Sequence, residues 1–347
     1  MSVVRIGLDA TYSLGGNLSG VGVYSRELIC GLAAAHLDTE FLCCYRPHRF
    51  LAGLRQALPG NCRRRLLYEP LVPRSAELFH GMNQRLPRAR LRRTVSTFHD
   101  LFVIAGEYSS PEFRRRFEAQ ARDAAERSDL IIAVSEFTAN QVEQLLKVER
   151  SRLRVVHHGV RFPAEEGEAV PREKIVLHTG AIQKRKNVSR LVAAFAALPA
   201  GWRLALAGSC GYGSEEILRE IAESPRREDI QVLGYVPDSE LARWYGRASI
   251  FAFPSLDEGF GMPVLEAMAR GVPVLTSNGS ALPEVAGDAA LLVDPANGDA
   301  IAAGLLQLAQ DESLREALRV KGRIRAAAFP WEAAVSQTWS VYRELGL

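Results

Sequence analysis

The sequence predicts an α/β fold made of two doubly wound parallel sheets, each in its own domain. Length is the first reason, because 347 residues exceed what one hydrophobic core of ordinary size holds. The second reason is the alternation of short β-rich runs with amphipathic helical stretches, which is typical of parallel sheets built from βαβ units. The third reason is a break at residues 161–173, after which the same alternation starts again.

The first half, residues 1–160, begins with a strand and a helix. Its strands are expected at Val3–Leu8, Thr94–Phe98, Leu130–Val134 and Arg154–Val156. Between the first two strands, apolar side chains recur at helical spacing at Val21, Tyr24, Leu28 and Leu32. Ser110, followed by a proline, is placed to cap a second helix, with Phe113, Phe117, Ala121 and Ala124 on one face, and Ser135 to cap a third.

Residues 161–173 are interpreted as a linker because they hold two prolines and show no hydrophobic periodicity. The second domain is expected over residues 174–330. Its strands are predicted at Ile175–His178, Arg203–Ala207, Gln231–Leu233, Ile250–Phe253 and Val274–Thr276. An amphipathic helix is expected near the end, from Trp331 to Leu345. Two such domains predict a ligand cleft between them, lined by loops at the carboxyl ends of the strands.

Composition places the chain among ordinary globular proteins, since 47% of its residues are hydrophobic and 24% are charged. No apolar run reaches membrane-spanning length, and the first residues read as a strand rather than a signal peptide. The five cysteines show no metal-binding or redox spacing. We therefore expect a cytoplasmic protein with reduced thiols.

The net charge of +3 is unevenly distributed along the chain. Residues 1–165 hold 24 Lys and Arg against 17 Asp and Glu, a net charge of +7, and the remaining residues hold 19 against 23, a net charge of −4. This basic half has two interpretations: solvated helix faces and loops, or attraction to anionic lipid headgroups or a lipid-diphosphate acceptor. Nucleic acid is not expected as a partner, because no aromatic residues interleave with the basic ones.

The segment PSLDEGFGMPVLEAMARGVPV carries two acids eight positions apart, Glu258 and Glu266. Glu258 follows a predicted strand in a glycine-containing loop, and Pro263 then opens a short helix that Gly271 ends. A helix N-terminus favours an anion such as phosphate, and a carboxylate one turn into that helix can accept hydrogen bonds from sugar hydroxyls. Paired carboxylates also serve glycoside hydrolysis, but a hydrolase does not need a phosphate site. Two unrelated surface acids remain the structural alternative.

A second candidate is the basic run Lys184, Arg185 and Lys186 in HTGAIQKRKN. It follows the first strand of the second domain, where Gly180 turns the chain and Asn187 can cap the next helix. Cations at the carboxyl end of a strand suit a diphosphate, although basic surface runs are common.

A third candidate is the glycine loop at residues 15–22, between the first strand and the first helix. It lacks the Gly-x-Gly-x-x-Gly order of a dinucleotide-binding loop. It suits a close approach between backbone and ligand, and a plain flexible turn is the alternative.

These motifs, in this order, resemble the Glu-x7-Glu signature of retaining glycosyltransferases of family 4, and the resemblance covers nearly the whole chain. The stretches HDLF, AVSEFTA and RKN are similar to the bacterial mannosyltransferase branch. The resemblance implies two facing Rossmann-like domains, the GT-B architecture. The first domain would bind the acceptor, the second the sugar nucleotide, and the final helix, residues 331–347, would return to the first domain.

The resemblance also implies roles for individual residues. His99 and Glu258 would contact the transferred sugar, and Glu266 would hold the ribose. Arg185 and Lys186 would neutralise the leaving diphosphate. The remaining donor contacts would come from Gly20, Gly180, Gly234, Tyr235, Gly259, Phe260, Gly261 and Met262. His157 and His158 stand where relatives tend to carry Tyr-Asn, which leaves their role open.

The implied reaction is transfer of a hexose, with retention of configuration, from a nucleotide sugar to a saccharide or lipid-linked saccharide in polysaccharide or lipopolysaccharide synthesis. GDP-mannose is the favoured donor, and UDP-glucose is an alternative. No Asp-x-Asp motif for a divalent ion occurs, so we expect no metal and no cofactor. The other possibilities are a two-domain epimerase or phosphorylase, or a non-catalytic scaffold that binds a nucleotide sugar. The enzyme is expected in the cytoplasm, and its basic half is compatible with peripheral contact at the inner face of the cytoplasmic membrane.

Overall fold

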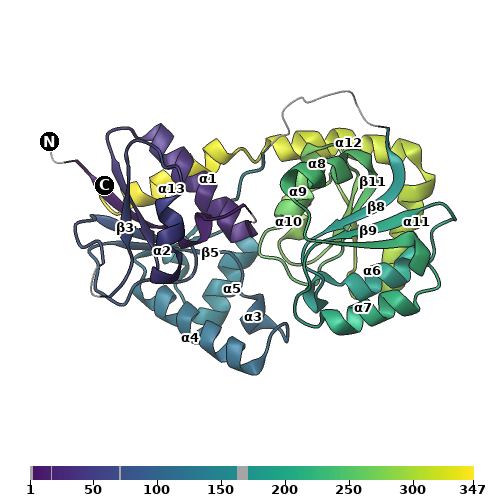
Figure 1. Ribbon diagram of the computed structural model, residues 1–347, viewed down its shortest axis with the longest axis horizontal. Coiled ribbons are helices and arrows are strands. Elements are labelled where there is room, and N and C mark those ends of the chain that lie inside the picture. The colour runs from purple at the N-terminus through teal and green to yellow at the C-terminus, as the bar shows by residue number, and fades with distance from the viewer. Residues whose placement is uncertain (1–2, 17, 70–71, 162–170) are drawn as a thin grey trace. The chain divides into compact units, whose positions relative to one another are not determined.

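The computed structural model describes residues 3–16, 18–69, 72–161 and 171–347, and most of the expected linker lies outside these ranges. The chain divides into two compact units, each of which is described by itself (Figure 1). Unit 1 comprises Met1–Gly159 together with Pro330–Leu347, and unit 2 comprises Val160–Phe329. The two doubly wound α/β domains predicted from the sequence are confirmed.

Unit 1 contains a seven-stranded parallel sheet in the order β3-β2-β1-β4-β5-β6-β7. Its strands are β1 (Arg5–Asp9), β2 (Glu40–Tyr45), β3 (Cys62–Leu66), β4 (Leu78–Gly81), β5 (Thr94–Phe98), β6 (Leu130–Ala133) and β7 (Leu153–Val155). Its helices are α1 (Gly20–Ala35), α2 (Pro47–Leu54), α3 (Phe102–Ala105), α4 (Pro111–Arg127), α5 (Glu136–Leu146) and α13 (Trp331–Glu344). Short 3-10 turns lie at η1 (Ala10–Ser13) and η2 (Arg150–Arg152).

Two helix starts in unit 1 follow from their capping residues. Ser110 accepts a hydrogen bond from the backbone N–H of Phe113 at 3.2 Å, and Ser135 accepts one from Thr138 at 2.9 Å. The helical face predicted for α4 is only partly correct, because Phe113 is 43% exposed whereas Ala121 is buried. The apolar face of α4 therefore begins one turn later than the periodicity suggested.

Strands β2, β3 and β4 were not predicted. The sequence of β3, CRRRL, belongs to the basic half, for which solvated helix faces and loops are one interpretation, yet it forms the edge strand with alternating buried and exposed positions. Edge strands tolerate such charges because one side faces water. Arg64 Nε donates to the carbonyl of Gly53 at 2.9 Å, so part of this basic run is structural.

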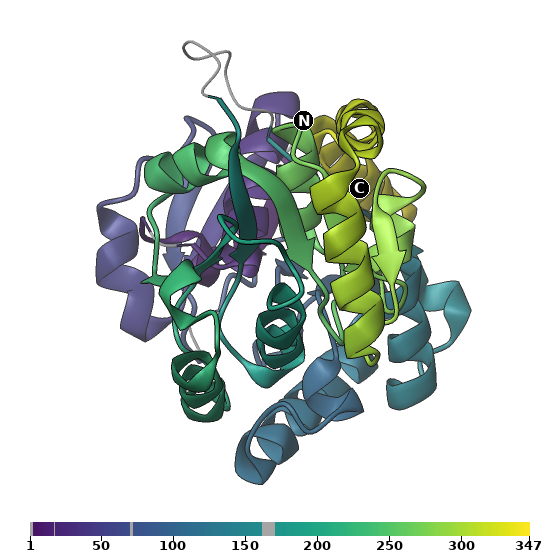
Figure 2. The same ribbon diagram turned by 90° about the vertical axis from the view of Figure 1, so that its right-hand side faces the viewer.

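Unit 2 contains a six-stranded parallel sheet in the order β10-β9-β8-β11-β12-β13. Its strands are β8 (Glu173–Thr179), β9 (Arg203–Ala207), β10 (Ile230–Gly234), β11 (Ala248–Phe253), β12 (Val274–Ser277) and β13 (Leu291–Val293). Its helices are α6 (Val188–Phe195), α7 (Ser214–Glu223), α8 (Asp238–Arg247), α9 (Met262–Ala269), α10 (Leu282–Ala286), α11 (Gly298–Gln310) and α12 (Glu312–Ala327), with turns η3 (Lys184–Lys186) and η4 (Arg227–Asp229). Helices cover both faces of this sheet (Figures 1 and 2).

Both sheets reverse their strand order at one point, which lies between β1 and β4 in unit 1 and between β8 and β11 in unit 2. Ligands of open α/β sheets bind outside the carboxyl ends of the strands at such a reversal. Within unit 2, the loops that leave β8 and β11 therefore meet side by side. These two loops carry the predicted basic run and Glu258.

Candidate functional site

The loops that follow β8 and β11 bring Glu258 between Arg185 and Lys186. One carboxylate oxygen of Glu258 lies 2.6 Å from Lys186 Nζ, and the other lies 3.0 Å from Arg185 Nη1. All three residues are less than 10% exposed. A buried charge is tolerated only when it is paired, so these residues depend on one another.

The pKa of Glu258 reflects this pairing. Burial alone would raise it, but the positive charges of Arg185 and Lys186 outweigh burial and lower the pKa to about 2. Glu258 is thus ionised at neutral pH, and the triad as a whole carries a net charge of +1. That net charge favours an anionic ligand at the same edge of the sheet.

Glycines shape the backbone beneath the basic run. Gly180 has φ +135°, and a Cβ atom there would lie 3.4 Å from Lys186 Cε. A Cβ atom on Gly208 would lie 1.9 Å from the carbonyl oxygen of Gly180, so only glycine fits at that position. These two positions let the loops after β8 and β9 run in close contact.

Asn187 fastens the same turn to the rest of unit 2. It adopts the left-handed conformation with φ +59° and is buried. Its side-chain amide donates to the carbonyls of Pro254 at 2.9 Å and Pro295 at 2.7 Å. The side chain makes no capping bond to α6, contrary to the interpretation of the sequence. Asn187 instead ties the basic run to the loop that leads to Glu258.

Glu266 lies in α9 with partners different from those of Glu258. Its carboxylate accepts a hydrogen bond from the Tyr245 hydroxyl at 3.2 Å, and that hydroxyl also lies 3.2 Å from Thr179 Oγ1. Burial raises the pKa of Glu266, while the charge of Arg270 and the Tyr245 hydrogen bond act in the opposite direction. Tyr245 and Thr179 were not predicted, because an apolar helical position and a strand end carry no distinguishing pattern.

The remaining donor-side residues surround the start of α9. Gly261 occupies the N-cap position with φ +112°, and a Cβ atom there would lie 2.7 Å from Leu282 Cδ2. Because the N-cap residue is glycine, it makes no side-chain capping bond to this helix. Met262 is the first helical residue, Phe260 is buried, and Gly259 precedes it in the loop.

On the other side of the sheet reversal, the carboxyl end of β10 carries Gly234 and Tyr235. Gly234 has φ +65°, and its carbonyl accepts a hydrogen bond from Gly208 N at 2.7 Å. Tyr235 is 45% exposed, so its ring is accessible to a ligand.

A layered contact beneath the site was also missed. His178 in β8 stacks on Phe253 with ring centroids 5.7 Å apart, and Lys186 Nζ lies 4.6 Å from the centroid of the same Phe253 ring. The His178 Nδ1–H donates to the carbonyl of Ala252 at 2.9 Å. Burial lowers the pKa of His178 to about 4, so the imidazole is neutral at pH 7 and adds no positive charge near Lys186.

His99 lies in unit 1, after β5, and both of its ring nitrogens have partners. Nε2 is 2.9 Å from the carbonyl of Met82 and therefore donates to it, and Nδ1 is 3.3 Å from Nε2 of His158. Tyr24 packs edge-on against the His99 ring at 4.8 Å. Burial lowers the pKa of His99 to about 4, so the imidazole is neutral at pH 7. Gly20, the other predicted residue in unit 1, is the first residue of α1.

A buried chain of hydrogen bonds lies beside His99. The Tyr342 hydroxyl of α13 is 2.6 Å from His80 Nδ1, His80 Nε2 is 2.7 Å from Thr97 Oγ1, and Thr97 Oγ1 is 2.8 Å from the Tyr24 hydroxyl. Burial lowers the pKa of His80 to about 3. This chain links α13, β4, β5 and α1 and fixes the ring that packs on His99.

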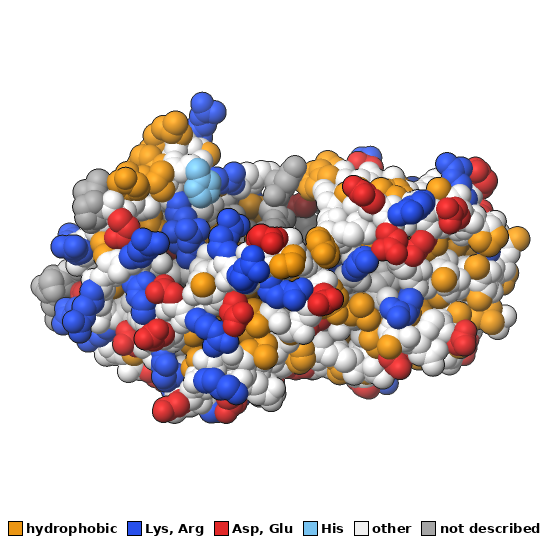
Figure 3. Space-filling view, turned by 90° about the horizontal axis from the view of Figure 1, so that it is seen from below, with side chains coloured by type: hydrophobic (Ala, Val, Ile, Leu, Met, Phe, Trp, Pro, Cys, Tyr) orange, Lys and Arg blue, Asp and Glu red, His pale blue; other side chains and the backbone are white. Residues whose placement is uncertain are grey.

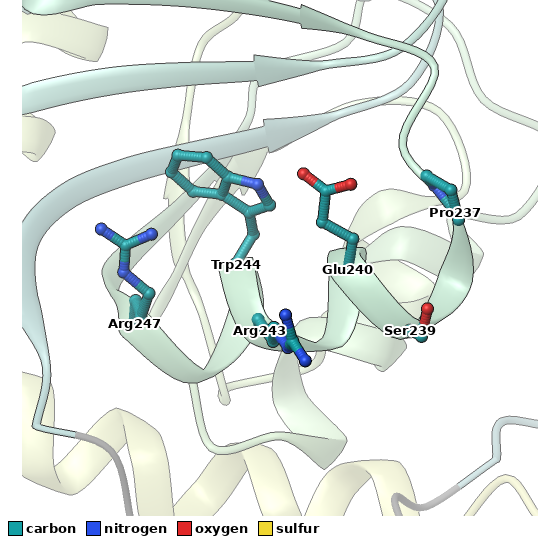
Figure 4. Close-up of a pocket in the computed structure, with 6 residues that line it drawn as sticks. All are labelled: Pro237, Ser239, Glu240, Arg243, Trp244 and Arg247. Carbon is teal, nitrogen blue, oxygen red and sulfur yellow. The ribbon is translucent and has the colours of Figure 1, made fainter.

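A surface hollow of about 430 Å³ lies along α8 in unit 2, apart from the predicted residues (Figure 4). It is lined by Pro237, Ser239, Glu240, Arg243, Trp244 and Arg247. Arg247 stacks over the Trp244 ring at 5.0 Å and pairs with Glu173, so the wall of this hollow is held in place by an ion pair.

Within residues 3–16, 18–69, 72–161 and 171–347, no three His, Cys, Asp or Glu side chains are grouped in a way that would hold a metal ion. In the same part of the chain, no helix combines the length and the apolar character needed to cross a bilayer.

Comparison with known proteins gives matches along both units. A profile described as "Glycosyltransferase Family 4" matches residues 18–162, and one described as "Glycosyl transferases group 1" matches residues 163–325. O-antigen chain mannosyltransferase B of Escherichia coli is 34% identical over 371 residues, spanning 94% of this chain and 97% of the relative.

Solved structures share the fold. A sucrose-phosphate synthase from Thermosynechococcus elongatus superposes with a TM-score of 0.78 at 23% identity, covering 99% of each chain. WaaG, described as a glycosyltransferase involved in lipopolysaccharide biosynthesis, superposes with a TM-score of 0.73 at 15% identity, covering 98% of this chain and 99% of WaaG.

Proposed function

This chain belongs to glycosyltransferase family 4, and on that premise we propose that it is a retaining mannosyltransferase with GDP-mannose as its donor. The acceptor we propose is a saccharide or lipid-linked saccharide in polysaccharide or lipopolysaccharide synthesis. The sequence identity of 34% with an O-antigen chain mannosyltransferase, over almost the whole of both chains, supports mannose as the sugar. The chain is a glycosyltransferase, and the finer assignment of donor and acceptor is the proposal.

The observation that carries this proposal is the buried triad of Glu258, Arg185 and Lys186 beside the uncapped start of α9. Its net positive charge suits the diphosphate of a nucleotide sugar. Two buried cations can stabilise the charge that develops on the leaving diphosphate without reorganisation of solvent. Glu258 keeps both cations in place, and its free lone pairs can accept hydrogen bonds from the transferred sugar.

In the reaction we propose, the bond between the sugar C1 and the diphosphate oxygen breaks while the acceptor oxygen bonds to C1 on the same face. The acceptor hydroxyl gives its proton to a phosphate oxygen of the leaving group. Glu266 holds the ribose hydroxyls, with Tyr245 fixing its carboxylate. His99, neutral and held by Met82 and His158, contributes to the shape of the sugar site rather than acting as an acid.

We propose that no metal takes part, since Arg185 and Lys186 can supply the charge stabilisation. An excess of a chelator such as EDTA should leave transfer activity unchanged. Loss of activity that returns on addition of Mg²⁺ or Mn²⁺ would contradict this.

The deciding experiment is calorimetric titration with GDP, UDP and ADP in metal-free buffer. GDP should bind at least about tenfold more tightly than the other two, a difference of about 1.4 kcal/mol. Preferred binding of UDP would contradict GDP-mannose as the donor and would favour a UDP-sugar such as UDP-glucose. Absence of binding to all three nucleotides would overturn the donor site.

We also propose that the enzyme works in the cytoplasm, with unit 1 at the anionic surface of the membrane. Lys and Arg side chains gather on unit 1, at the left of Figure 3, more densely than on unit 2. On α2, Leu51 and Leu54 are 76% and 52% exposed. Vesicles containing phosphatidylglycerol should sediment the protein, and vesicles of phosphatidylcholine alone should not.

A further inference from the structure

Three arginines gather beneath the glycine-containing turn that follows β1 in unit 1. We name Arg26, Arg46 and Arg49 the arginine cluster. Arg26 comes from α1, Arg46 immediately precedes α2, and Arg49 lies in its first turn. All three are only partly exposed. They lie at the carboxyl end of β1, at the edge of the sheet where a ligand of this fold binds.

Two members of the cluster bind backbone carbonyl groups of the turn. Arg26 Nη2 donates to the carbonyl of Gly15 at 2.5 Å and to that of Ser13 at 3.2 Å. Arg49 Nη2 donates to the carbonyl of Leu14 at 2.6 Å. These contacts fix the turn, but a carbonyl group carries no net charge.

Only the third arginine has an acidic partner among the described residues. Arg46 Nη2 lies 3.0 Å from Oδ2 of Asp9, and the Asp9 side chain is 1% exposed. Arg46 Nε is buried and has no hydrogen-bond partner within that part of the chain. The three guanidinium groups and the Asp9 carboxylate together carry a net charge of +2.

A purely structural role does not account for this charge. Hydrogen bonds to carbonyl groups satisfy the guanidinium donors but do not neutralise their charge, and partly buried cations are costly unless an anion balances them. A single carboxylate would balance half of the excess. A phosphoryl group carries a charge of about −2 at neutral pH and has three acceptor oxygens, so it matches both the charge and the unused guanidinium donors.

We propose that the arginine cluster binds a phosphoryl group carried by the acceptor. This inference rests on the proposed function and narrows its acceptor to saccharides that bear a phosphomonoester or diphosphate. Arg185 and Lys186 belong to unit 2, whereas the arginine cluster belongs to unit 1. In this proposal, the acceptor phosphoryl group and the donor diphosphate are thus bound by residues of different units.

The test uses pyrophosphate as the probe and calorimetry on the full chain. All variants are made in a Lys186→Gln background, called the parent, because this substitution weakens pyrophosphate binding at the donor site of unit 2. In this parent, the pair Arg26→Gln and Arg49→Gln should weaken pyrophosphate binding at least about tenfold, since charge-assisted hydrogen bonds are lost while Gln can still reach the carbonyl groups. The matched control is Arg115→Gln with Arg122→Gln on α4, which removes the same charge at exposed positions and should change binding less than about twofold.

Equal weakening in both pairs, or a parent that binds no pyrophosphate, would overturn the proposal. A second arm uses vesicles of phosphatidylcholine with phosphatidylglycerol. If the cluster variants lose vesicle binding but keep pyrophosphate binding, the phosphoryl group belongs to a lipid headgroup and the proposal is wrong. Thermal unfolding verifies that the variants fold, and the single variant Arg49→Gln replaces the pair if they do not.

GDP titration of the same variants with Lys186 intact separates this proposal from the donor assignment. GDP affinity should fall by less than the pyrophosphate affinity does, because Arg185, Lys186 and Glu266, the residues proposed to hold the nucleotide, all lie in unit 2 and are unchanged. Failure of the donor assignment would appear as absent GDP binding in every variant. Failure of the acceptor inference would appear only in the pyrophosphate titration.

Discussion

At the scale of single residues, Glu258 shows how charges inside a protein depend on each other. Its carboxylate pairs with two buried cations, Arg185 and Lys186, and removal of one member of this triad upsets the charge balance of the other two. Such a loss costs far more than the loss of an exposed ion pair.

The first prediction concerns stability. Glu258→Gln should lower the free energy of unfolding of unit 2 by about 3 to 5 kcal/mol at pH 7, because Arg185 and Lys186 stay buried while the carboxylate that pairs with both is lost. Glu216→Gln, which breaks the exposed pair with Lys184, should leave the free energy of unfolding nearly unchanged. Urea unfolding measures both values.

The same variant predicts a pH dependence with a defined sign. The folded-state pKa of Glu258 is about 2, below the ordinary value of about 4.3 for an unfolded glutamate. Its stabilisation is therefore present above about pH 4.3 and is lost as the pH falls toward 2. The difference in unfolding free energy between the native chain and Glu258→Gln should shrink across this interval, and a difference that stays constant would contradict the pairing.

The third prediction concerns Glu266, whose pKa is raised by burial. Nucleotide affinity should fall as the pH is lowered through this pKa, because the ionised carboxylate is the stronger acceptor for ribose hydroxyls. Tyr245→Phe removes a hydrogen bond that lowers the pKa of Glu266, so the midpoint should move to higher pH. GDP dissociation constants measured from pH 5 to 8 give this midpoint. The pH dependence that remains in Glu266→Gln comes from titration of the nucleotide phosphate rather than of Glu266.

Sequence reasoning at this scale identified residues but not their hydrogen-bond partners. Glu258, Arg185 and Lys186 follow neighbouring strands, so their meeting could be anticipated from the topology of parallel sheets. The partners of His99 could not be anticipated, since Met82 and His158 are distant in the chain and show no common pattern. The left-handed conformation of Asn187 was likewise hidden, because its role depends on carbonyl groups of two remote prolines.

At the scale of helices and strands, Arg172 joins two helices that carry the candidate nucleotide contacts. Its Nη1 donates to the carbonyls of Tyr245 and Ala248, both at 2.7 Å, at the end of α8. Its Nη2 donates to the carbonyls of Arg270 and Gly271, at 2.8 and 3.0 Å, at the end of α9. One cation thus stabilises the negative ends of two helix dipoles.

The fourth prediction follows from this clamp. Arg172→Gln should lower the unfolding free energy of unit 2 by about 3 kcal/mol, because buried carbonyl groups lose charge-assisted donors. It should also weaken GDP binding several-fold, since Tyr245 and Glu266 lie on the two helices. Arg227→Gln, which removes an exposed pair with Glu228, is the control and should change neither value. Unchanged stability in Arg172→Gln would contradict the clamp.

Elements could be predicted where their pattern was long and periodic. Strands such as β8 and β11 are continuous apolar runs between turn residues, as expected for strands buried on both faces. Strand β3 was missed because three arginines hide its alternation, and β4 because four residues ending in His-Gly resemble a turn. In each case the deciding factor is a neighbouring strand that the local sequence does not reveal.

At the scale of the whole molecule, unit 1 is assembled from two separate stretches of chain. The helix α13 buries Trp331, Val335 and Tyr342 in unit 1, and the Trp339 ring stacks on His36 at 3.5 Å. A Cβ atom on Gly31 of α1 would lie 2.4 Å from Val335, so the two helices pack very closely.

The fifth prediction is that the units differ in their response to loss of α13. Deletion of residues 331–347 should make unit 1 sensitive to proteases, because its apolar surface and His80 lose their cover. Unit 2 should stay resistant and should retain GDP binding within about threefold, since its core is continuous in sequence. Limited proteolysis with mass spectrometry measures this, with deletion of residues 345–347 as the control. Equal protease sensitivity of both units would show that they fold as one.

The placement of α13 also has a consequence for biosynthesis. The ribosome releases the first 159 residues of unit 1, then all of unit 2, and only afterwards the helix that completes unit 1. Unit 2 can reach its native state while it is being translated, whereas unit 1 must wait with an open groove along α1 until α13 emerges. The nascent chain would therefore expose this groove to chaperones throughout the translation of unit 2. Unit 1 is the first unit to be started on the ribosome and the last to be completed.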